Sequence, residues 1–231
     1  MAGMTLAING DLSLPVVVDT RSMEWSPSPS GSVWRKRVHR VGPPESGQVT
    51  SVVRYEPEST FPAHDHPDGE EILVLDGVFS DEHGDWGQGS YLLNPEGFRH
   101  APFSRKGCLL FVKLRQFPGR DRHHVAVDTR TLPWQSTSSA GISTSRLYEQ
   151  AGFVDTMRLE RWKAGMPAEP RTYAQGVELF VIDGAFHDET GRHATGSWLR
   201  FPVGSGHLAG TDGGCTLYVK EGGFAYLDSA P

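Results

Sequence analysis

The segment HDHPDGEE at residues 64–71 holds two histidines one residue apart and, after a Pro and a Gly, two adjacent glutamates. Side chains two residues apart on a β-strand point to the same face, so His64 and His66 can converge on one ion. Glu70 and Glu71 point to opposite faces, so only one of them can readily join the histidines. Taken alone, the HxH pattern is equally typical of two histidines on an exposed strand.

A third histidine favours a metal site over two exposed histidines, because His100 in NPEGFRHAP has the matching position in a second expected hairpin. Three imidazoles and one carboxylate suit a divalent transition ion such as Zn, Fe(II), Mn, Ni or Cu, whereas Ca and Mg prefer sites built from oxygen alone. Such a site leaves coordination positions open, so metal-assisted oxygenation is chemically available. The sequence singles out no catalytic residue beyond these ligands.

The chain contains an internal repeat. The segment EILVLDGVFSDEHGDWGQGSYLLNPEGFRHAPFSRKGCLLFVK at 71–113 aligns without a gap to 178–220, at a constant offset of 107 residues. Upstream of each copy, VDTRSMEW at 18–25 matches VDTRTLPW at 127–134. The repeat predicts two copies of one domain.

Each copy has the pattern of a β-rich domain. Short runs rich in Val, Leu, Phe and Tyr alternate with turn clusters at the spacing of a sandwich or barrel, and no stretch is patterned for a helix of several turns. We therefore predict an all-β fold of two jelly-roll barrels in tandem, at 1–117 and 127–231, joined by a linker at 118–126. Such folds enclose a cavity in which chemistry can take place.

The histidine segments resemble the two sequence motifs of the cupin family. PAHDHPDGEEILVLDG fits the first motif, which runs HxH, three residues, Glu70, six residues and a glycine. GSYLLNPEGFRH fits the second motif at Gly89, Pro95, Gly97 and His100. The surrounding sequence is similar to the ChrR-like cupins, named for the zinc-binding C-terminal domain of the anti-sigma factor ChrR, and the likeness is weaker in the second copy.

This resemblance implies a bicupin of two double-stranded β-helix barrels. It also implies one divalent transition metal held by His64, His66, Glu70 and His100, with Zn or Fe(II) favoured and Mn or Ni also suitable. Sigma binding by ChrR belongs to a separate N-terminal helical domain, and this chain begins directly with the β-repeat, so we expect no sigma-factor partner.

The second copy lacks three of the four expected ligands. At the constant offset it carries Arg171, Tyr173 and Val177 in their places and keeps only His207. We therefore expect one metal per chain, in the first domain, and a degenerate second domain without a metal site. The role of His207 stays open between a structural histidine and part of a small-ligand site with Arg171 and Tyr173.

The repeat also distinguishes the two glutamates. The position of Glu70 loses its carboxylate together with the other ligands, whereas Glu71 is kept as Glu178. This pattern predicts Glu70 as the ligand and Glu71 as an architectural residue. Lys113 is kept as Lys220, so we predict an ion pair between Glu71 and Lys113, against the alternative that both are exposed charges.

Function follows less directly from these residues. Some stand-alone cupins of this broad group cleave diketones or hydroxyacetophenones as Fe(II) dioxygenases, so the resemblance implies a dioxygenase acting on a small diketone or aromatic ketone. The alternative is a non-catalytic, metal-dependent stress sensor or transcriptional regulator acting through a protein partner. A fold alone does not decide between them.

Composition narrows the range of partners. The net charge of −6, from 22 basic and 28 acidic residues, argues against nucleic acid. Apolar runs such as LLFV are too short to span a bilayer, and the N-terminal segment lacks the pattern of a secretory signal, so we expect a cytoplasmic protein. A small-molecule substrate or ligand is the expected partner, and homodimer formation stays open. Cys108 and Cys215 occupy matching apolar segments, which predicts two reduced core thiols.

Overall fold

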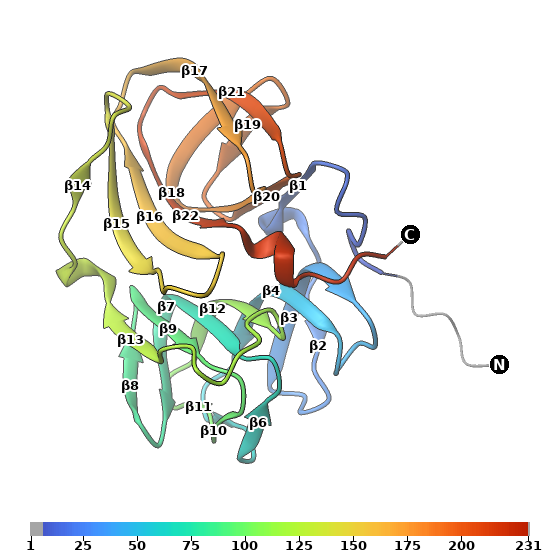
Figure 1. Ribbon diagram of the computed structural model, residues 1–231. Coiled ribbons are helices and arrows are strands. Elements are labelled where there is room, and N and C mark those ends of the chain that lie inside the picture. Colours follow the sequence, from blue (N-terminus) through green and yellow to red (C-terminus); the bar gives the residue numbers. More distant parts are fainter. Residues whose placement is uncertain (1–6, 231) are drawn as a thin grey trace. The chain divides into compact units, whose positions relative to one another are not determined.

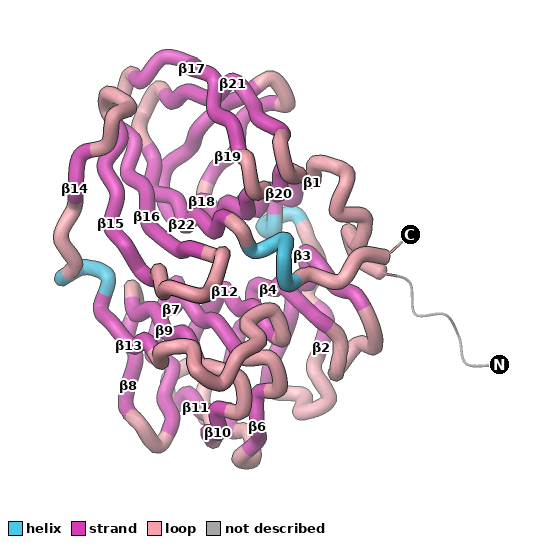
Figure 2. Tube along the Cα trace, in the orientation of Figure 1, coloured by secondary structure: helices cyan, strands magenta, loops and turns pink. Residues whose placement is uncertain are grey.

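The computed structural model describes residues 7–230, and the chain consists almost entirely of strands and loops (Figures 1 and 2). Within this range the helical elements are three short 3-10 turns, η1 (Thr20–Ser22), η2 (Thr129–Thr131) and η3 (Gly223–Tyr226). The prediction of an all-β fold is confirmed. None of the helical turns between residues 7 and 230 has the length and apolar character needed to cross a membrane.

The first compact unit contains residues 7–10, 23–130 and 226–230 of the described chain. Its main sheet has the strand order β13 (Val125–Asp128), β9 (Ser90–Asn94), β7 (Glu70–Asp81), β12 (Cys108–Leu114), β4 (Gln48–Tyr55), β3 (Val33–Val41) and β2 (Ser26–Pro27). Attached to it are β5 (Ser59–Thr60), β8 (Gly84–Gly87) and β11 (Phe103–Ser104). A separate antiparallel pair consists of β6 (His64–His66) and β10 (Phe98–His100).

The second compact unit contains residues 11–22 and 131–225. Its main sheet repeats the same order with β1 (Val16–Asp19), β20 (Ser197–Phe201), β18 (Val177–Asp188), β22 (Cys215–Glu221), β16 (Thr156–Trp162), β15 (Ile142–Tyr148) and β14 (Gln135–Ser136). β19 (Gly191–Ala194) pairs with β18, and β17 (Met166–Tyr173) pairs with β21 (Ser205–Thr211). The sequence repeat is therefore a repeat of structure.

Each unit takes one edge strand from the segment that precedes the other copy. β1 pairs with β20, and β13 pairs with β9, so both sheet edges are completed by VDT segments. The hydroxyl of Thr20 donates to the carbonyl of Gly196, and that of Thr129 donates to Gly89, each at 2.7 Å. The predicted boundaries divide the chain once, at the linker. In the structure, the first unit also contains residues 226–230 from the C-terminal end, and the second unit also contains residues 11–22 from the N-terminal part.

Alternation along the central strands builds a separate apolar core in each unit. Ile72 and Val74 of β7 face the core of the first unit, where Cys108 also lies. Cys215 lies in the core of the second unit. Both thiols are free and buried, which confirms the expected core cysteines, and burial raises the pKa of Cys108 to about 11 and that of Cys215 to about 12.

Gly77, the last residue of the first motif, has a structural role. Its φ is 74°, and a Cβ there would lie 2.3 Å from the carbonyl oxygen of Gly107. The equivalent Gly184 has a φ of 72°, and its Cβ would lie 2.2 Å from the carbonyl oxygen of Gly214. Because the second unit keeps this glycine without the metal ligands, the fold requires it.

Gly77→Ala should lower the free energy of unfolding by about 2 kcal/mol or more, because a left-handed backbone strains an L-residue and the new methyl group meets a carbonyl oxygen. Urea unfolding of the purified variant measures this loss. Gly87→Ala, at a strand position where an added Cβ has no heavy atom within 4 Å, is the matched control and should unfold like the parent chain. Equal stability of both variants would contradict the assignment.

Candidate metal centre

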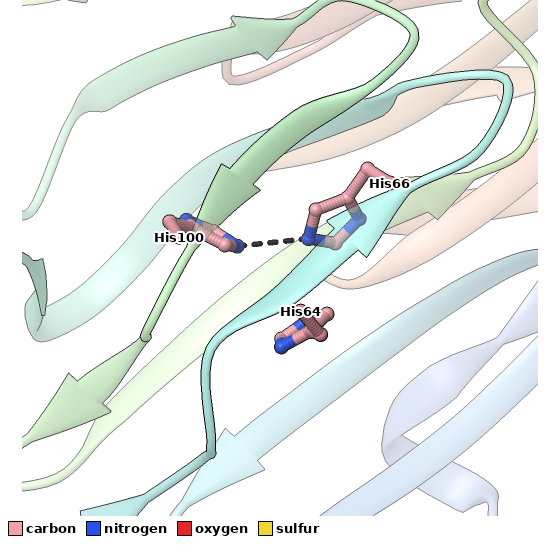
Figure 3. A group of neighbouring side chains, drawn as sticks. All are labelled: His64, His66 and His100. Carbon is pink, nitrogen blue, oxygen red and sulfur yellow. Dashed lines mark hydrogen bonds between the residues drawn. The ribbon is translucent and has the colours of Figure 1, made fainter.

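The pairing of β6 with β10 brings the three predicted histidines together. His64 lies opposite His100 in this antiparallel pair, and His66 projects from the same strand as His64 (Figure 3). One ring nitrogen from each of the three lies within 4.8 Å of the others. The Nε2 atoms of His66 and His100 are 2.8 Å apart.

A tight turn between β6 and β7 returns the chain so that Glu70 joins this cluster. Asp68 and Gly69 form the turn with φ values of 55° and 72°. Glu70 Oε2 then lies 3.5 Å from Nε2 of His66 and 3.5 Å from Nε2 of His100. Of the four residues predicted as ligands, the three histidines therefore form one cluster, and Glu70 lies beside two of them, His66 and His100.

The neighbouring carboxylate of Glu71 points away from this cluster. It accepts a hydrogen bond from the hydroxyl of Tyr91 at 2.6 Å. The sheet register places Lys113 directly opposite Glu71, as it places Lys220 opposite Glu178. Glu71 and Lys113 are both buried, so the alternative of two exposed charges is wrong, and the ion pair between them stays a prediction.

Hydrogen bonds outside the cluster orient the imidazoles toward its centre. His64 Nδ1 lies 2.9 Å from the carbonyl oxygen of Pro62, and His100 Nδ1 lies 3.1 Å from Asp81 Oδ2. Both partners only accept, so in the neutral rings each Nδ1 carries the proton and each Nε2 carries the lone pair. The amide of Asn94 donates to Glu70 Oε2 at 2.9 Å and fixes the carboxylate.

The donor set fits a divalent transition ion. Ligand atoms bound at about 2.0–2.1 Å to one such ion lie roughly 3–3.4 Å apart, close to the 2.8 Å and 3.5 Å separations found here. A cation between the imidazole lone pairs and the carboxylate would offset the cost of burying them. His66, His100 and Glu70 would hold it from the buried side, and the half-buried His64 would complete the set.

Burial and charge act in opposite directions on these groups. Burial lowers the pKa of His66. Burial also opposes protonation of His100, but the hydrogen bond to Asp81 and the charge of Glu70 outweigh it and raise the pKa of His100. Burial alone would raise the pKa of Asp81, yet hydrogen bonds from His100 and the backbone of His83 lower it, so Asp81 stays an ionised acceptor.

Asp81 is a site residue that the sequence analysis missed. The second unit has Asp188 at the same offset, and its Oδ2 lies 2.8 Å from Nδ1 of His207. An aspartate kept at the constant offset in both copies was the signal that could have found it. Because this bond persists without the other ligands, it holds the histidine strand onto the end of the long central strand in both units.

In the second unit, aromatic packing fills the place of the ligands. The hydroxyl of Tyr173 lies 2.9 Å from Nε2 of His207. Phe201 occupies the position of Asn94, and its ring centroid lies 4.4 Å from that of His207. Arg171 forms an ion pair with Glu160 at 3.0 Å. Its guanidinium group is therefore engaged with Glu160 and does not form a ligand site with His207. These contacts favour the structural role of His207.

His64 and His66 border a pocket of about 340 Å³. An adjoining inner chamber of about 90 Å³ shares His64 and His66 with it and also contains Glu70. The chamber is otherwise mostly apolar, with walls formed by Val33, Val53, Tyr55, Ile72, Phe79 and Leu110. The outer pocket is lined by Arg35, Arg37 and Arg115, none of which was predicted from the sequence. The alternation of basic and apolar residues in WRKRVHR could have indicated Arg35 and Arg37.

Comparisons with known proteins agree with this architecture. The ChrR Cupin-like domain model matches the chain twice, at residues 13–118 and 122–225. A search of curated proteins finds no match to this sequence.

Solved structures of similar fold include three metal-binding or oxygenase-related proteins. One is a protein from Nostoc punctiforme for which a dioxygenase function has been suggested, with 16% identity, a TM-score of 0.70, and 90% of this chain and 82% of that chain covered. A pirin from Escherichia coli in complex with nickel(II) has 14% identity and a TM-score of 0.61, with 90% and 98% covered. A variant of salicylate 1,2-dioxygenase from Pseudoaminobacter salicylatoxidans has 13% identity and a TM-score of 0.59, with 78% and 74% covered. These likenesses confirm the predicted cupin fold.

Glu70→Gln should weaken metal binding at least about tenfold, because it removes the carboxylate beside His66 and His100. Glu71→Gln, the matched control one residue along the strand, should keep the metal. It should lose about 1–3 kcal/mol of stability, because it weakens the buried hydrogen bond from Tyr91. Elemental analysis after dialysis and thermal unfolding measure both effects. Metal loss in Glu71→Gln with retention in Glu70→Gln would show that the wrong glutamate was chosen.

Metal affinity should fall as the pH is lowered through the range near and above about 6.5, because protons compete for the imidazoles. The raised pKa of His100 makes this loss begin above the ordinary histidine range, and the lowered pKa of His66 adds its loss only at lower pH. Competition with a chelator of known affinity, measured at a series of pH values, tests this. An affinity that stays constant from about pH 8 to about pH 5.5 would rule out histidine ligation.

Proposed function

Because this chain belongs to the ChrR cupin-like domain family, we propose that it is a bicupin that binds one divalent transition metal per chain in its first unit. The proposed ligands are His64, His66, Glu70 and His100. The support for this assignment is the approach of the three histidine nitrogens to within 4.8 Å of one another, with Glu70 Oε2 3.5 Å from those of His66 and His100. Imidazole and carboxylate ligands favour Zn or Fe(II), with Mn or Ni also suitable.

The activity that we propose is dioxygenation of a small diketone or aromatic ketone. The supporting observation is the apolar chamber beside His64 and His66, which is open to the larger pocket and offers room for a small organic molecule. When bound, the metal would supply Lewis acidity and a redox centre for reaction with O₂.

The residues of the chain supply positioning and a dry environment for this reaction. The carbonyl of Pro62 and the carboxylate of Asp81 hold His64 and His100 in fixed orientations, and Asn94 holds Glu70. The apolar walls of the inner chamber exclude water and would pack against the body of the substrate. Tyr55 in this wall has a pKa raised by burial, so it remains a neutral phenol.

The alternative function is a non-catalytic, metal-dependent sensor or regulator that acts through a protein partner. Such a protein needs a metal but no chamber for a small molecule next to it. The chamber therefore favours a small-molecule substrate or ligand as the partner of this site.

Protein purified without chelators or metal-affinity resin should contain one equivalent of metal per chain. The Fe(II)-loaded protein should then consume one O₂ for each molecule of a cleaved 1,3-diketone or aromatic ketone, as both oxygen atoms enter the products. An oxygen electrode and product analysis measure this. Glu70→Gln is the control, and it should consume no O₂ above background.

Two results would overturn parts of this proposal. Two equivalents of metal per chain would contradict a single site in the first unit. Tight binding of Zn, with no O₂ consumption in the Fe(II) form on any carbonyl compound of the screen, would contradict the dioxygenase and favour the sensor.

A further inference from the structure

Arginine side chains from two strands line the mouth of the pocket in the first unit. Arg35 and Arg37 alternate along β3 on the same side as the core residue Val33. Arg115, the residue after β12, lines the same pocket. Arg35 also lines the inner chamber, so it borders both the outer pocket and the chamber beside the histidines.

A single carboxylate bridges the two arginines of β3. Nη1 of Arg35 donates to Glu45 Oε2 at 2.7 Å, and Nη2 of Arg37 donates to Glu45 Oε1 at 3.0 Å. The side chain of Glu45 is 48% exposed, whereas those of Arg35 and Arg37 are 20% and 13% exposed. Ion pairs with an exposed partner contribute little to stability, so another carboxylate can replace that of Glu45.

Arg115 is held in a backbone conformation that favours glycine. Its φ is 60°, and at the same offset in the second unit stands Gly222, with a φ of 74°. Nε of Arg115 donates to the carbonyl of Ser46 at 2.8 Å, on the same loop as Glu45. An arginine kept at a strained position beside a pocket indicates a role for its side chain.

Positive charge exceeds negative charge at this mouth. Besides Glu45, the acidic residue lining the outer pocket is Asp65, which forms an ion pair with Arg99 at 3.2 Å. Burial and, to a lesser extent, the neighbouring charge of Arg35 lower the pKa of Arg37. The two guanidinium groups share the single carboxylate of Glu45. A planar anion that bridges them would relieve this repulsion.

The second unit lacks the arginine pair of β3 along with three of the candidate ligands. Ile142 lies opposite Trp162 as Val33 lies opposite Tyr55, so Thr144 takes the place of Arg35. Arg146 takes the place of Arg37, and its side chain is 72% exposed. The bridged and mostly buried pair of Arg35 and Arg37 therefore accompanies the candidate metal site and not the barrel fold.

We propose that the pocket binds a small carboxylate whose anionic group bridges Arg35 and Arg37 in place of Glu45, while its apolar part enters the chamber beside His64 and His66. The substrate of the dioxygenase is then a carbonyl compound that also carries a carboxylate, and this identification rests on the function proposed above. Glu45 is the internal carboxylate that a ligand displaces, and Arg115 holds the loop that carries it.

Isothermal titration calorimetry with benzoate and its neutral isostere benzamide tests the binding site, on both metal-loaded and chelator-treated protein. Benzoate should bind at least tenfold more tightly than benzamide in both forms. Arg37→Gln should weaken benzoate at least tenfold, and Arg130→Gln, which removes an exposed arginine outside the pocket, should not change it. Glu45→Gln should strengthen benzoate binding several-fold, because it removes the carboxylate that competes with benzoate for the arginines. A substitution that only disturbed folding would weaken binding instead.

Equal binding of benzoate and benzamide, or unchanged benzoate affinity in both Arg37→Gln and Glu45→Gln, would overturn the carboxylate site. Tighter binding of inorganic phosphate than of benzoate, with the same dependence on Arg37, would also overturn it. The outcome is separable from that of the dioxygenase. Arginine-dependent benzoate binding without O₂ consumption would leave the carboxylate site standing, and cleavage of neutral diketones without benzoate binding would leave the enzyme standing.

Discussion

The strand β7 has Glu70 as its first residue and Asp81 as its last, and both carboxylates lie beside the same imidazole, that of His100, at 3.5 Å and 3.1 Å. A straight strand of 12 residues would separate its ends by roughly 40 Å. β7 must therefore bend sharply, and Gly77, with its left-handed backbone and close approach to Gly107, lies in the region where the pairing with β12 shifts register. The curvature of this strand places Glu70 among the candidate ligands and Asp81 behind His100, where it orients the imidazole.

The two units act as an internal comparison between architecture and chemistry. The glycine at the bend and the aspartate–histidine bond at the strand end occur in both, so they belong to the barrel. The other three candidate ligands occur only in the first unit, as do Arg35 and Arg115, while Arg37 has an exposed counterpart in Arg146. We therefore assign these residues to the chemistry of the first unit. In the second unit, Val177 and Phe201 replace a carboxylate and an amide, which converts a polar site into packed core. Burial of unpaired polar groups would otherwise be costly.

Charge is distributed unevenly along the pocket of the first unit. The inner chamber has mostly apolar walls around Glu70, His64 and His66, with Arg35 shared with the mouth, where Arg37 and Arg115 add two further guanidinium groups. A molecule with an apolar body and one anionic end matches this gradient better than a neutral one. Because arginine is charged at all physiological pH values, this preference does not depend on pH.

Much of the site could be predicted from the sequence, because period-two alternation and the internal repeat are local properties that spacing alone reveals. They determined the all-β fold and the tandem barrels, and they led to the prediction that Glu70, which lies beside His66 and His100, is the ligand and Glu71 is not. The exchange of β1 and β13, the bond from Asp81 to His100, and the meeting of Arg35 and Arg37 with Glu45 were decided by tertiary structure. Those contacts depend on strand curvature, edge pairing and loop closure, which join residues that no sequence period relates.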